Sequence, residues 1–438
     1  MSCVELTIEK LVYGGDGLAR LAPDGGQPRA IAVFVPYVLP AERVEASLVE
    51  ERPGFARGRA ERLLEASPVR VEPPCPYFGA CGGCHYQHAS YDAQLRFKSE
   101  ILRETLRRTA KLDLRLDIQV HASLPLAYRN RTRFHVRSRP EFAIGYFKHG
   151  SHELLPVREC PISSPLINRM LAKLWRLDAG SLPEGIGEIE LFANAADDKL
   201  QVELYRHGNS HSHQELIKFA RDLAIAAPEI HGIVSLARSK VLSRSLDQPK
   251  SELLYGEDAM TYEVSGENYR VSAGAFFQVN RNLLPRMRDL VVNGRKGRVA
   301  LDLYSGVGLF AVPLAQRFER VIAVESSPLS SADLRVNAPP NVKVSTQSTE
   351  AYLTAVAGTL RPDVIVADPP RAGLGPKVCA QISKLAAPEI IYVSCDPATL
   401  ARDVKQLTSE GWQISEMHLI DLFPQTFHIE TCTVLRRE

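Results

Sequence analysis

The sequence lacks the features that would place this chain in a membrane or outside the cell. None of its apolar runs approaches the about 20 residues that a membrane-spanning helix needs. The first residues, MSCVELTIEKLVYGG, contain no apolar segment behind a basic one, so a signal peptide is not expected. These absences predict a cytoplasmic protein with no membrane partner. Structural disulfides are rare in the cytosol, so the eight cysteines are expected to be ligands, nucleophiles or buried small hydrophobic residues.

The sequence also has little net charge and no internal repeat or low-complexity tract. A formal net charge of +2 does not select a class of partner. The charge is unevenly distributed, however, because residues 96–137 contain eleven Lys or Arg and only four Asp or Glu. A basic block of this kind favours a polyanionic partner such as a nucleic acid, and a solvated helix face is the alternative interpretation.

The 438 residues are enough for roughly two to four domains. Residues 1–68 contain short apolar segments separated by Gly and Pro turns, such as GGDG at 14–17, and this pattern predicts a small β-barrel. Residues 269–438 alternate Val, Ile and Leu-rich runs with helical patterns. Such runs are typical of parallel strands covered on both faces, so this segment predicts a doubly wound α/β domain.

The segment 69–268 between them is expected to be an α+β domain. Its clearest helix is 90–111, with Ser90 as N-cap and Leu95, Leu102 and Leu106 on one face. Packing of this helix on the C-terminal domain is an alternative to packing within the central one. Residues 128–147 predict a hairpin. Basic residues alternate along its first strand, so we expect one face of that strand to bind phosphates; they are Arg131, Arg133, His135 and Arg137.

Three cysteines are clustered in CPYFGACGGCHYQH at 75–88, with the spacing C-x5-C-x2-C; they are Cys75, Cys81 and Cys84. Cys160, in VRECPI, is the candidate for a fourth ligand. Proline follows both Cys75 and Cys160, as it does at iron–sulfur ligands. The pattern predicts a metal site. Spacing alone does not separate zinc from a [4Fe–4S] cluster, and redox-active thiols are a further alternative.

A glycine turn marks the start of the C-terminal domain's ligand site. In LDLYSGVGLFA at 301–311, Gly306 and Gly308 let the backbone approach a ligand at a helix N-terminus. Glu325 ends the next strand, where a carboxylate binds a ribose in such folds. The motif fits a dinucleotide as well as another adenosine cofactor, so a nicotinamide-dependent oxidoreductase stays open at this point.

Two further strand ends carry chemistry. Asp368 stands in VADPPRAGL and Cys395 in YVSCDPATLARD, each after an apolar run. Ligands of open α/β sheets bind beyond the carboxyl ends of the strands, so the side chains at these ends are expected to line one site: Tyr304, Glu325, Asp368 and Cys395. A reactive thiol beside an adenosine cofactor favours group transfer over hydride transfer.

These motifs together resemble the RNA (uracil-5-)-methyltransferase family, in its iron–sulfur branch of 23S rRNA enzymes. The similarity spans nearly the whole chain, from YGGDGLARL in a TRAM-like RNA-binding barrel through the cysteine motif and FFQVN to LDLYSGVGLF, DPPRAGL, SCDPATLARD and FPQTFHIETCTVL. It implies a Rossmann-like methyltransferase domain that uses S-adenosylmethionine, and a [4Fe–4S] cluster in preference to zinc.

The resemblance also implies roles for single residues. Cys395 would attack C6 of uracil, and Glu430 would act as the general base, with His428 in reserve. Seven residues match contacts of the cofactor: Gln278, Tyr304, Gly306, Gly308, Glu325, Ser348 and Asp368. For Gln278 and Asp368, contact with the target base is the alternative.

The expected partner is RNA, either rRNA or tRNA, and the chain is expected to be a monomer. Two other functions stay open. An enzyme that methylates an amino group would commonly carry an aromatic residue after Pro-Pro, where this chain has Arg371. A non-catalytic RNA-binding protein with a metal site would not need both Cys395 and Glu430.

Overall fold

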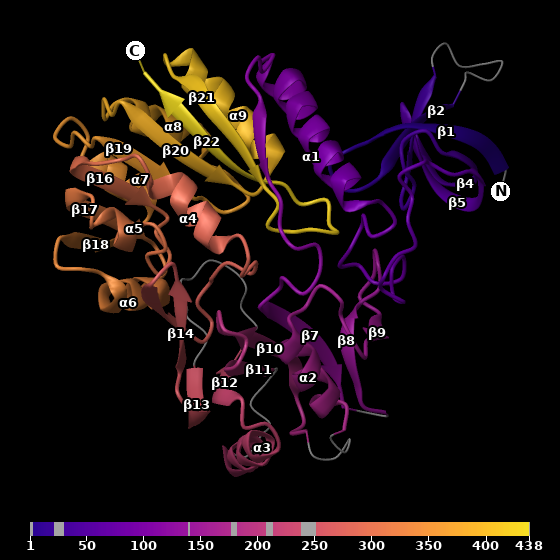
Figure 1. The fold of residues 1–438 in the computed structure, drawn as a ribbon, viewed down its shortest axis with the longest axis horizontal. Helices are drawn as coiled ribbons and strands as arrows, with labels where there is room; N and C mark the ends of the chain where they lie inside the picture. The colour runs from indigo at the N-terminus through magenta and orange to yellow at the C-terminus, as the bar shows by residue number, and fades with distance from the viewer. Residues whose placement is uncertain are drawn as a thin grey trace.

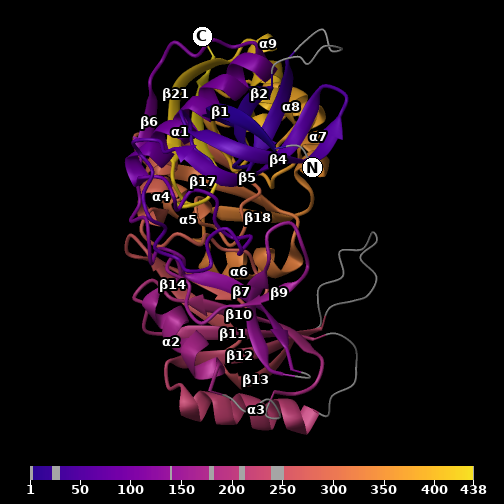
Figure 2. The ribbon, with the colours of Figure 1, turned by 90° about the vertical axis from the view of Figure 1, so that its right-hand side faces the viewer.

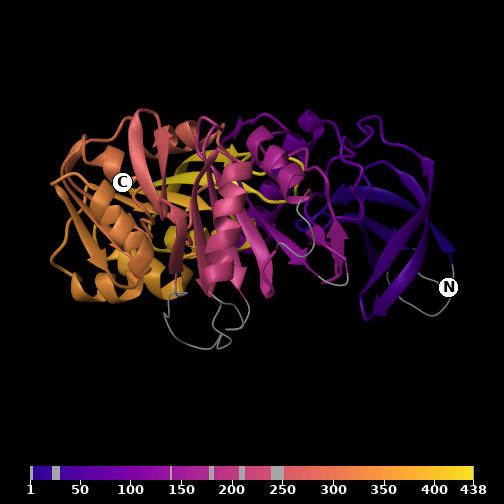
Figure 3. The same ribbon diagram turned by 90° about the horizontal axis from the view of Figure 1, so that it is seen from below.

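The computed structural model describes residues 3–21, 30–138, 141–176, 182–206, 213–237 and 251–437. Figure 1 shows a barrel at the N-terminus, a large sheet that contains the C-terminus, and a second sheet between them in the chain. Seen from below, the barrel lies at one end of the molecule and the C-terminus near the other (Figure 3). No helix in the described ranges is both long and apolar enough to cross a membrane.

The N-terminal barrel confirms the prediction from its turns. Its strands are β1 (Cys3–Leu11), β2 (Gly17–Leu21), β3 (Ile31–Val35), β4 (Arg43–Arg52) and β5 (Phe55–Glu65), closed in the order β1-β2-β3-β5-β4. Alternate residues such as Leu6 and Ile8 point inward and are almost completely buried. Gly14 and Gly15 form the turn from β1 to β2 with φ of 112° and 101°, a region that favours glycine.

A seven-stranded sheet forms the centre of the chain, in the order β13-β12-β11-β10-β7-β8-β9. Its elements are β7 (Arg131–Arg137), β8 (Ala143–Phe147), β9 (Leu154–Pro156), α2 (Pro165–Leu174), β10 (Ile186–Ala193), β11 (Leu200–Arg206), α3 (His213–Ala226), β12 (Ile230–Ala237) and β13 (Ser251–Gly256). The predicted hairpin is present as β7 paired with β8. Helices α2 and α3 share one buried cluster with the strands. Figure 2 shows this sheet below the C-terminal region, with α3 at the far end.

The face of β7 that we expected to bind phosphates is occupied by acidic partners, so that expectation is wrong for its first residues. Arg131 ion-pairs with Glu190 and, at 2.8 Å, with Glu203. Arg133 pairs with Glu190 at 2.5 Å and has Glu188 at 3.5 Å. The glutamates come from β10 and β11, so the pattern within β7 alone could not reveal them.

The C-terminal sheet confirms the predicted α/β fold. Eight strands lie in the order β18-β17-β16-β19-β20-β22-β21-β6, with β22 antiparallel to both neighbours. In chain order its elements are β6 (Ile118–His121), α4 (Leu284–Val292), β16 (Gly297–Leu303), α5 (Ala311–Leu314), β17 (Phe318–Glu325), α6 (Pro328–Asn337), β18 (Val342–Thr346), α7 (Thr349–Ala355), β19 (Val364–Ala367), α8 (Gly375–Ser383), β20 (Glu389–Ser394), α9 (Pro397–Ser409), β21 (Gln413–Ile420) and β22 (Glu430–Arg436). The hairpin of β14 (Ala259–Val264) and β15 (Glu267–Ser272) precedes it.

Both faces of the C-terminal sheet are covered. Consecutive strand residues alternate between two buried clusters, so Leu301 belongs to one and Ala300 to the other. Helices α4, α5 and α6 cover the Ala300 face, and α8 and α9 cover the Leu301 face. This alternation accounts for the near-continuous apolar runs in the sequence.

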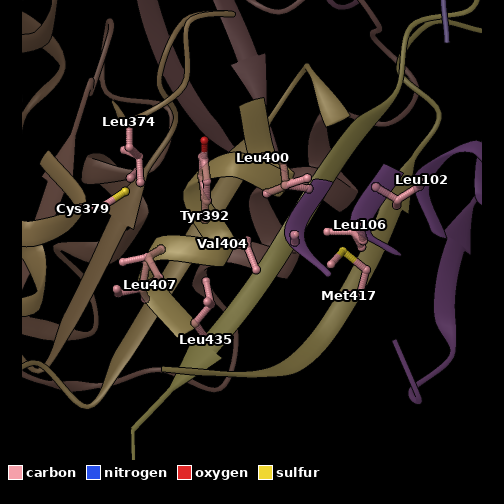
Figure 4. Close-up of a cluster of buried hydrophobic side chains, with 14 of the residues drawn as sticks. Leu102, Leu106, Leu374, Cys379, Tyr392, Leu400, Val404, Leu407, Met417 and Leu435 are labelled. Atoms are coloured by element: carbon pink, nitrogen blue, oxygen red, sulfur yellow. The ribbon is translucent and has the colours of Figure 1, made fainter. Parts of the chain in front are cut away.

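The helix α1 (Tyr91–Thr105) and the π-helical turn η1 (Leu106–Ala110) also cover the Leu301 face, although they lie far away in the sequence. Figure 4 shows Leu102 and Leu106 beside Met417 of the sheet. Strand β6 is added to the same sheet through β21. Two elements of the expected central segment thus belong structurally to the C-terminal sheet, and the division at residues 68 and 268 stays a prediction.

A buried ion pair fixes α1 to this sheet. Lys98 Nζ lies 2.5 Å from Asp421, just after β21, and donates to the carbonyl of Phe423 at 2.9 Å. Both side chains of the pair are completely buried. Tyr91 donates to the other carboxylate oxygen of Asp421 at 3.0 Å. Removing one partner of such a pair leaves an uncompensated buried charge, so this contact contributes strongly to the docking of α1.

We predict that Lys98→Met lowers the free energy of unfolding by about 3–5 kcal/mol, because Asp421 loses its counter-ion. Denaturant unfolding measures the change. The matched control is Lys377→Met, which breaks the exposed pair with Glu350 and should cost about 0–1 kcal/mol. Adding Asp421→Asn to Lys98→Met should recover part of the loss. Equal losses in the two single variants would contradict this account.

Candidate active site

Four strand ends meet at one edge of the C-terminal sheet. The parallel register pairs Leu303 with Val324 of β17 and with Ala367 of β19. The next residues along these strands are therefore neighbours, and Asp368 donates its amide to the carbonyl of Leu303 at 3.3 Å. Strand β20 lies beside β19 and ends at Ser394. The structure thus brings together the residues predicted for this edge: Tyr304, Glu325, Asp368 and Cys395.

The glycine turn closes tightly against the end of β17. Tyr304, Gly306 and Gly308 have φ of 62°, 54° and 101°. A Cβ at Gly308 would approach Leu334 Cδ1 to 2.6 Å, and its φ of 101° is one that other residues rarely adopt, so the position favours glycine. The Gly306 amide donates to Glu325 Oε2 at 2.9 Å, and the Ser327 amide donates to Oε1 at 2.6 Å. These bonds hold Glu325 half-buried beside the turn.

The two remaining residues expected to contact the cofactor, Ser348 and Gln278, lie on different segments of the C-terminal region. Ser348 is exposed and caps α7 by accepting a hydrogen bond from the Ala351 amide at 3.2 Å. Gln278 is buried and follows Phe277, which shares a buried cluster with Val307 of the glycine turn. Ser348 comes after β18, which is the edge strand of the sheet, whereas Gln278 lies on the segment that leads into α4.

Cys395 and Glu430 lie opposite each other at the ends of two adjacent antiparallel strands, β20 and β22. Ser394 at the end of β20 pairs with Thr431, so the next pair in register is Cys395 and Glu430. Cys395 is half-buried and Glu430 is 3% exposed. Burial raises the pKa of the Cys395 thiol to about 12; Glu430 and Asp368 add to this rise, whereas Arg371 opposes it. Burial also raises the pKa of Glu430 well above its usual range.

Asp302 is a functional candidate that the sequence reasoning missed. It lies inside β16 and is completely buried, and neither of its carboxylate oxygens has a hydrogen-bond partner among the described residues. Burial raises its pKa to about 8, and burial raises the pKa of Asp368 to about 7. The signal was present in LDLYSG, as a charged residue within an apolar strand. An unpartnered buried carboxylate beside the glycine turn suits a cationic ligand.

Arg371 lies near the Cys395 thiol, and His428 lies beside Arg371. Arg371 Nη2 donates to His428 Nε2 at 3.5 Å. Burial lowers the pKa of His428 to about 3, and Arg371 contributes to this shift, so the imidazole is neutral. A neutral imidazole so situated can accept a proton only weakly, which makes Glu430 the stronger candidate for the base.

The barrel also reaches this edge, through Tyr13. Its ring contacts Phe427 edge-on, with 5.5 Å between ring centroids. Burial raises the pKa of the Tyr13 phenol, and the nearby Asp396 carboxylate raises it further. Asp396 follows Cys395 and caps α9. No local pattern in YGGDG could have predicted this contact, because it depends on how the barrel packs.

The cysteines of the predicted metal site line one cavity of about 460 Å³, together with aromatic and glycine residues; they are Cys75, Cys81, Cys84 and Cys160. Burial raises the pKa of Cys84 to about 12. Arg129 also lines the cavity, and its buried Nε has no hydrogen-bond partner among the described residues. Within the same ranges, no three Cys, His, Asp or Glu lie close enough to hold a single metal ion. The cavity gathers the four thiols, and a buried guanidinium suits their ionised form.

Comparison with known proteins identifies relatives over the whole chain. The family described as tRNA (uracil-5-)-methyltransferase matches residues 90–438. An uncharacterized RNA methyltransferase of Thermotoga maritima is 32% identical over 98% of both chains. The 23S rRNA (uracil(1939)-C(5))-methyltransferase RlmD of Vibrio parahaemolyticus is 30% identical over 98% of this chain and 95% of its own.

A solved structure has the same fold. The tRNA (uracil-54, C5)-methyltransferase of Pyrococcus abyssi, in complex with S-adenosyl-L-homocysteine, superposes with a TM-score of 0.73. It covers 99% of this chain and is 23% identical to it. The barrel, the central sheet and the C-terminal sheet thus form one arrangement that both chains share.

We predict that alkylation of Cys395 by iodoacetamide rises about tenfold per pH unit between pH 7 and 10 without a plateau, because its pKa is about 12. Mass spectrometry of the Cys395 peptide measures the rate. Arg371→Gln should slow the reaction, since Arg371 lowers this pKa, and should leave the rate at exposed Cys3 unchanged. A plateau below pH 9, or a faster reaction in the variant, would contradict the assignment.

Proposed function

The chain belongs to the tRNA (uracil-5-)-methyltransferase family, and from this premise we propose that it transfers a methyl group from S-adenosylmethionine to C5 of one uridine in RNA through a covalent bond from Cys395. The family and its named relatives are RNA (uracil-C5)-methyltransferases, so the chain is an enzyme of this class. The observation that carries the covalent route is the register that sets Cys395 opposite Glu430.

We assign one residue to each step. The Cys395 thiol loses its proton to solvent, the resulting thiolate adds to C6, and the electron pair of the C5–C6 bond moves toward the C4 carbonyl as an enolate. C5 then takes the methyl group of the sulfonium, which leaves S-adenosylhomocysteine. Glu430 removes the proton from C5, and the C6–S bond breaks to release the thiolate. One thiol and one base acting in sequence are sufficient, and the two are neighbours in register.

Carboxylates around the glycine turn suit the cofactor. Glu325 is held beside Gly306 and would bind the ribose hydroxyls. Asp302 and Asp368 gain negative charge near neutral pH and would attract the sulfonium. The other cofactor contacts remain proposals: Gln278, Tyr304, Gly308 and Ser348.

The proposed substrate is a uridine of 23S rRNA. The Vibrio parahaemolyticus relative, named for that reaction, supports this choice. A tRNA uridine is the alternative, since the Pyrococcus abyssi neighbour acts on tRNA. A target inside folded RNA must leave its stack to reach Cys395. Action as a monomer in the cytoplasm stays a prediction.

The cysteine cavity is proposed to bind a [4Fe–4S] cluster through Cys75, Cys81, Cys84 and Cys160. The shared cavity of about 460 Å³ that these four cysteines line supports the proposal. The resemblance of the cysteine motif to the iron–sulfur branch of the family favours a cluster over zinc. When bound, the cluster would cross-link the segment 75–84 to Cys160. Methyl transfer moves no net electrons, so this role is structural.

We predict that the purified protein releases tritium from RNA labelled at uracil C5 when S-adenosylmethionine is added. Cys395→Ala should lower this release about a thousandfold or more, because the proposed bond to C6 needs this thiol. Cys3→Ala, in the exposed start of the barrel, is the control and should behave like the parent. Methyl incorporation with the tritium retained would refute transfer to C5.

The choice between rRNA and tRNA rests on a separate measurement. Mapping 5-methyluridine in both RNAs from a strain that lacks the gene should show one site lost from 23S rRNA and all tRNA sites kept. A loss confined to tRNA would overturn the rRNA proposal and leave the reaction itself intact.

We predict that protein purified without oxygen contains about four iron and four sulfide per chain. Cys160→Ser should lower both contents, since Cys160 supplies the ligand from outside the 75–84 segment. Cys379→Ser changes a buried thiol elsewhere and should leave them unchanged. One zinc per chain, or equal iron in both variants, would contradict the cluster.

A further inference from the structure

The loop between β21 and β22 leads directly into Glu430, and one residue in it has every polar group engaged. Gln425 is 5% exposed and has φ of 69°, a left-handed conformation that is unfavourable for a residue with a side chain. Figure 1 shows this yellow loop reaching beneath α1. A strained backbone persists where surrounding contacts determine it, so the contacts of Gln425 are informative.

Three segments that are distant in sequence hold Gln425. Its carbonyl accepts hydrogen bonds from the amides of His85 and Tyr86 at 2.8 and 2.9 Å. On α1, Gln94 Oε1 accepts from the Gln425 amide at 3.0 Å, and Gln94 Nε2 donates to Gln425 Oε1 at 2.9 Å. Gln425 Nε2 donates to the carbonyl of Pro125 at 3.3 Å.

The rest of the loop is held from the same side. Tyr128 donates to the carbonyl of Pro424 at 3.0 Å, and Lys98 donates to that of Phe423 at 2.9 Å. After Gln425, a bond within the loop adds to these contacts, because the His428 amide donates to the Thr426 hydroxyl at 3.2 Å. Glu430 opens β22, where it pairs with Ile420, and the contacts of Gln425 five residues earlier hold the loop that leads into this strand.

We propose that Gln425, gripped by Gln94 and by the His85 and Tyr86 amides, is a positioning residue that sets Glu430 for removal of the C5 proton. The inference rests on the proposed function for the identity of that step. His85 follows Cys84 directly, so the segment that carries three of the cavity's cysteines is bonded to the loop that delivers the base. Through these backbone hydrogen bonds, the position of the cysteine segment affects the position of Glu430.

The proposal separates two steps of the reaction. Cys395 follows β20 and is not part of this loop, so formation of the bond to C6 should be nearly insensitive to Gln94. Removal of the C5 proton needs Glu430 in position, and a displacement of about 1 Å can slow a catalytic step about a hundredfold. A disturbed loop should therefore let the methylated adduct accumulate.

The test compares Gln94→Met with Gln406→Met in single-turnover reactions on RNA labelled with tritium at uracil C5. Gln94→Met keeps the length of the side chain and removes both bonds to Gln425, whereas Gln406 lies on α9 and bonds the Pro376 carbonyl, away from the loop. We expect Gln94→Met to slow tritium release about tenfold to a hundredfold. An RNA–protein adduct should build up on denaturing gels, with the KM for RNA nearly unchanged. Gln406→Met should match the parent.

Two further variants test the assignment. Gln94→Glu keeps an oxygen to accept from the Gln425 amide and should recover part of the rate. Gln425→Gly suits the backbone φ and removes the side-chain bonds, and combining it with Gln94→Met should add little to either change alone. Equal slowing of adduct formation and tritium release, or full additivity, would overturn the proposal.

Hydrogen exchange of the free protein separates this inference from the proposed function. Gln94→Met should speed exchange in the peptide 421–430, and Gln406→Met should not. If the parent neither forms an adduct nor releases tritium, the proposed function fails while the exchange result still decides whether Gln94 holds the loop. Unchanged exchange in Gln94→Met would sink the positioning role.

Discussion

The site depends on one strand that runs against its neighbours. The strands from β16 to β20 pair with one another in parallel, whereas β22 is antiparallel to β20 and β21 and enters the sheet at the edge where β20 ends. A parallel β22 would start at the opposite edge and carry Glu430 away from Cys395. Antiparallel pairing fixes opposed residues through shared backbone hydrogen bonds, and a slip of one residue would reverse every side chain. The register therefore sets the backbones of the nucleophile and the base side by side, and the loop before β22 is the segment from which the base enters the sheet.

Contacts from the other parts of the chain complete this edge. The barrel supplies Tyr13 against Phe427, α1 supplies Gln94 and Lys98, and the cysteine segment supplies two amides to Gln425. All of them meet the stretch from Asp421 to His428, between β21 and β22. An enzyme that draws a uracil out of folded RNA would gain from this arrangement, because the barrel and the cysteine segment both contact the loop that precedes Glu430.

Local sequence patterns predicted the strands and turns better than they predicted which distant residues contact one another. The apolar runs ending at Leu303, Ala367 and Ser394 predicted a parallel sheet and the edge at which the chemistry lies, because strand ends of such sheets converge. The turn at Gly14 and Gly15 predicted a barrel. Sequence reasoning failed where a residue's partner lies far along the chain. Arg131 and Arg133 looked available for phosphate, yet the glutamates of β10 and β11 pair with them. Lys98 looked like part of a basic surface but is a buried counter-ion, and the placement of Tyr13, Gln94 and Gln425 follows only from packing.

The most direct test of the account is the fate of RNA that carries 5-fluorouridine at the target position. After Cys395 adds to C6 and C5 takes the methyl group, C5 holds fluorine and no proton, so Glu430 has nothing to remove and the adduct persists. The account predicts an RNA–protein adduct that survives denaturation, forms only with S-adenosylmethionine, and maps to the peptide containing Cys395 with one methyl group on the base. Methylation of ordinary RNA without any such adduct, or an adduct on another residue, would contradict it.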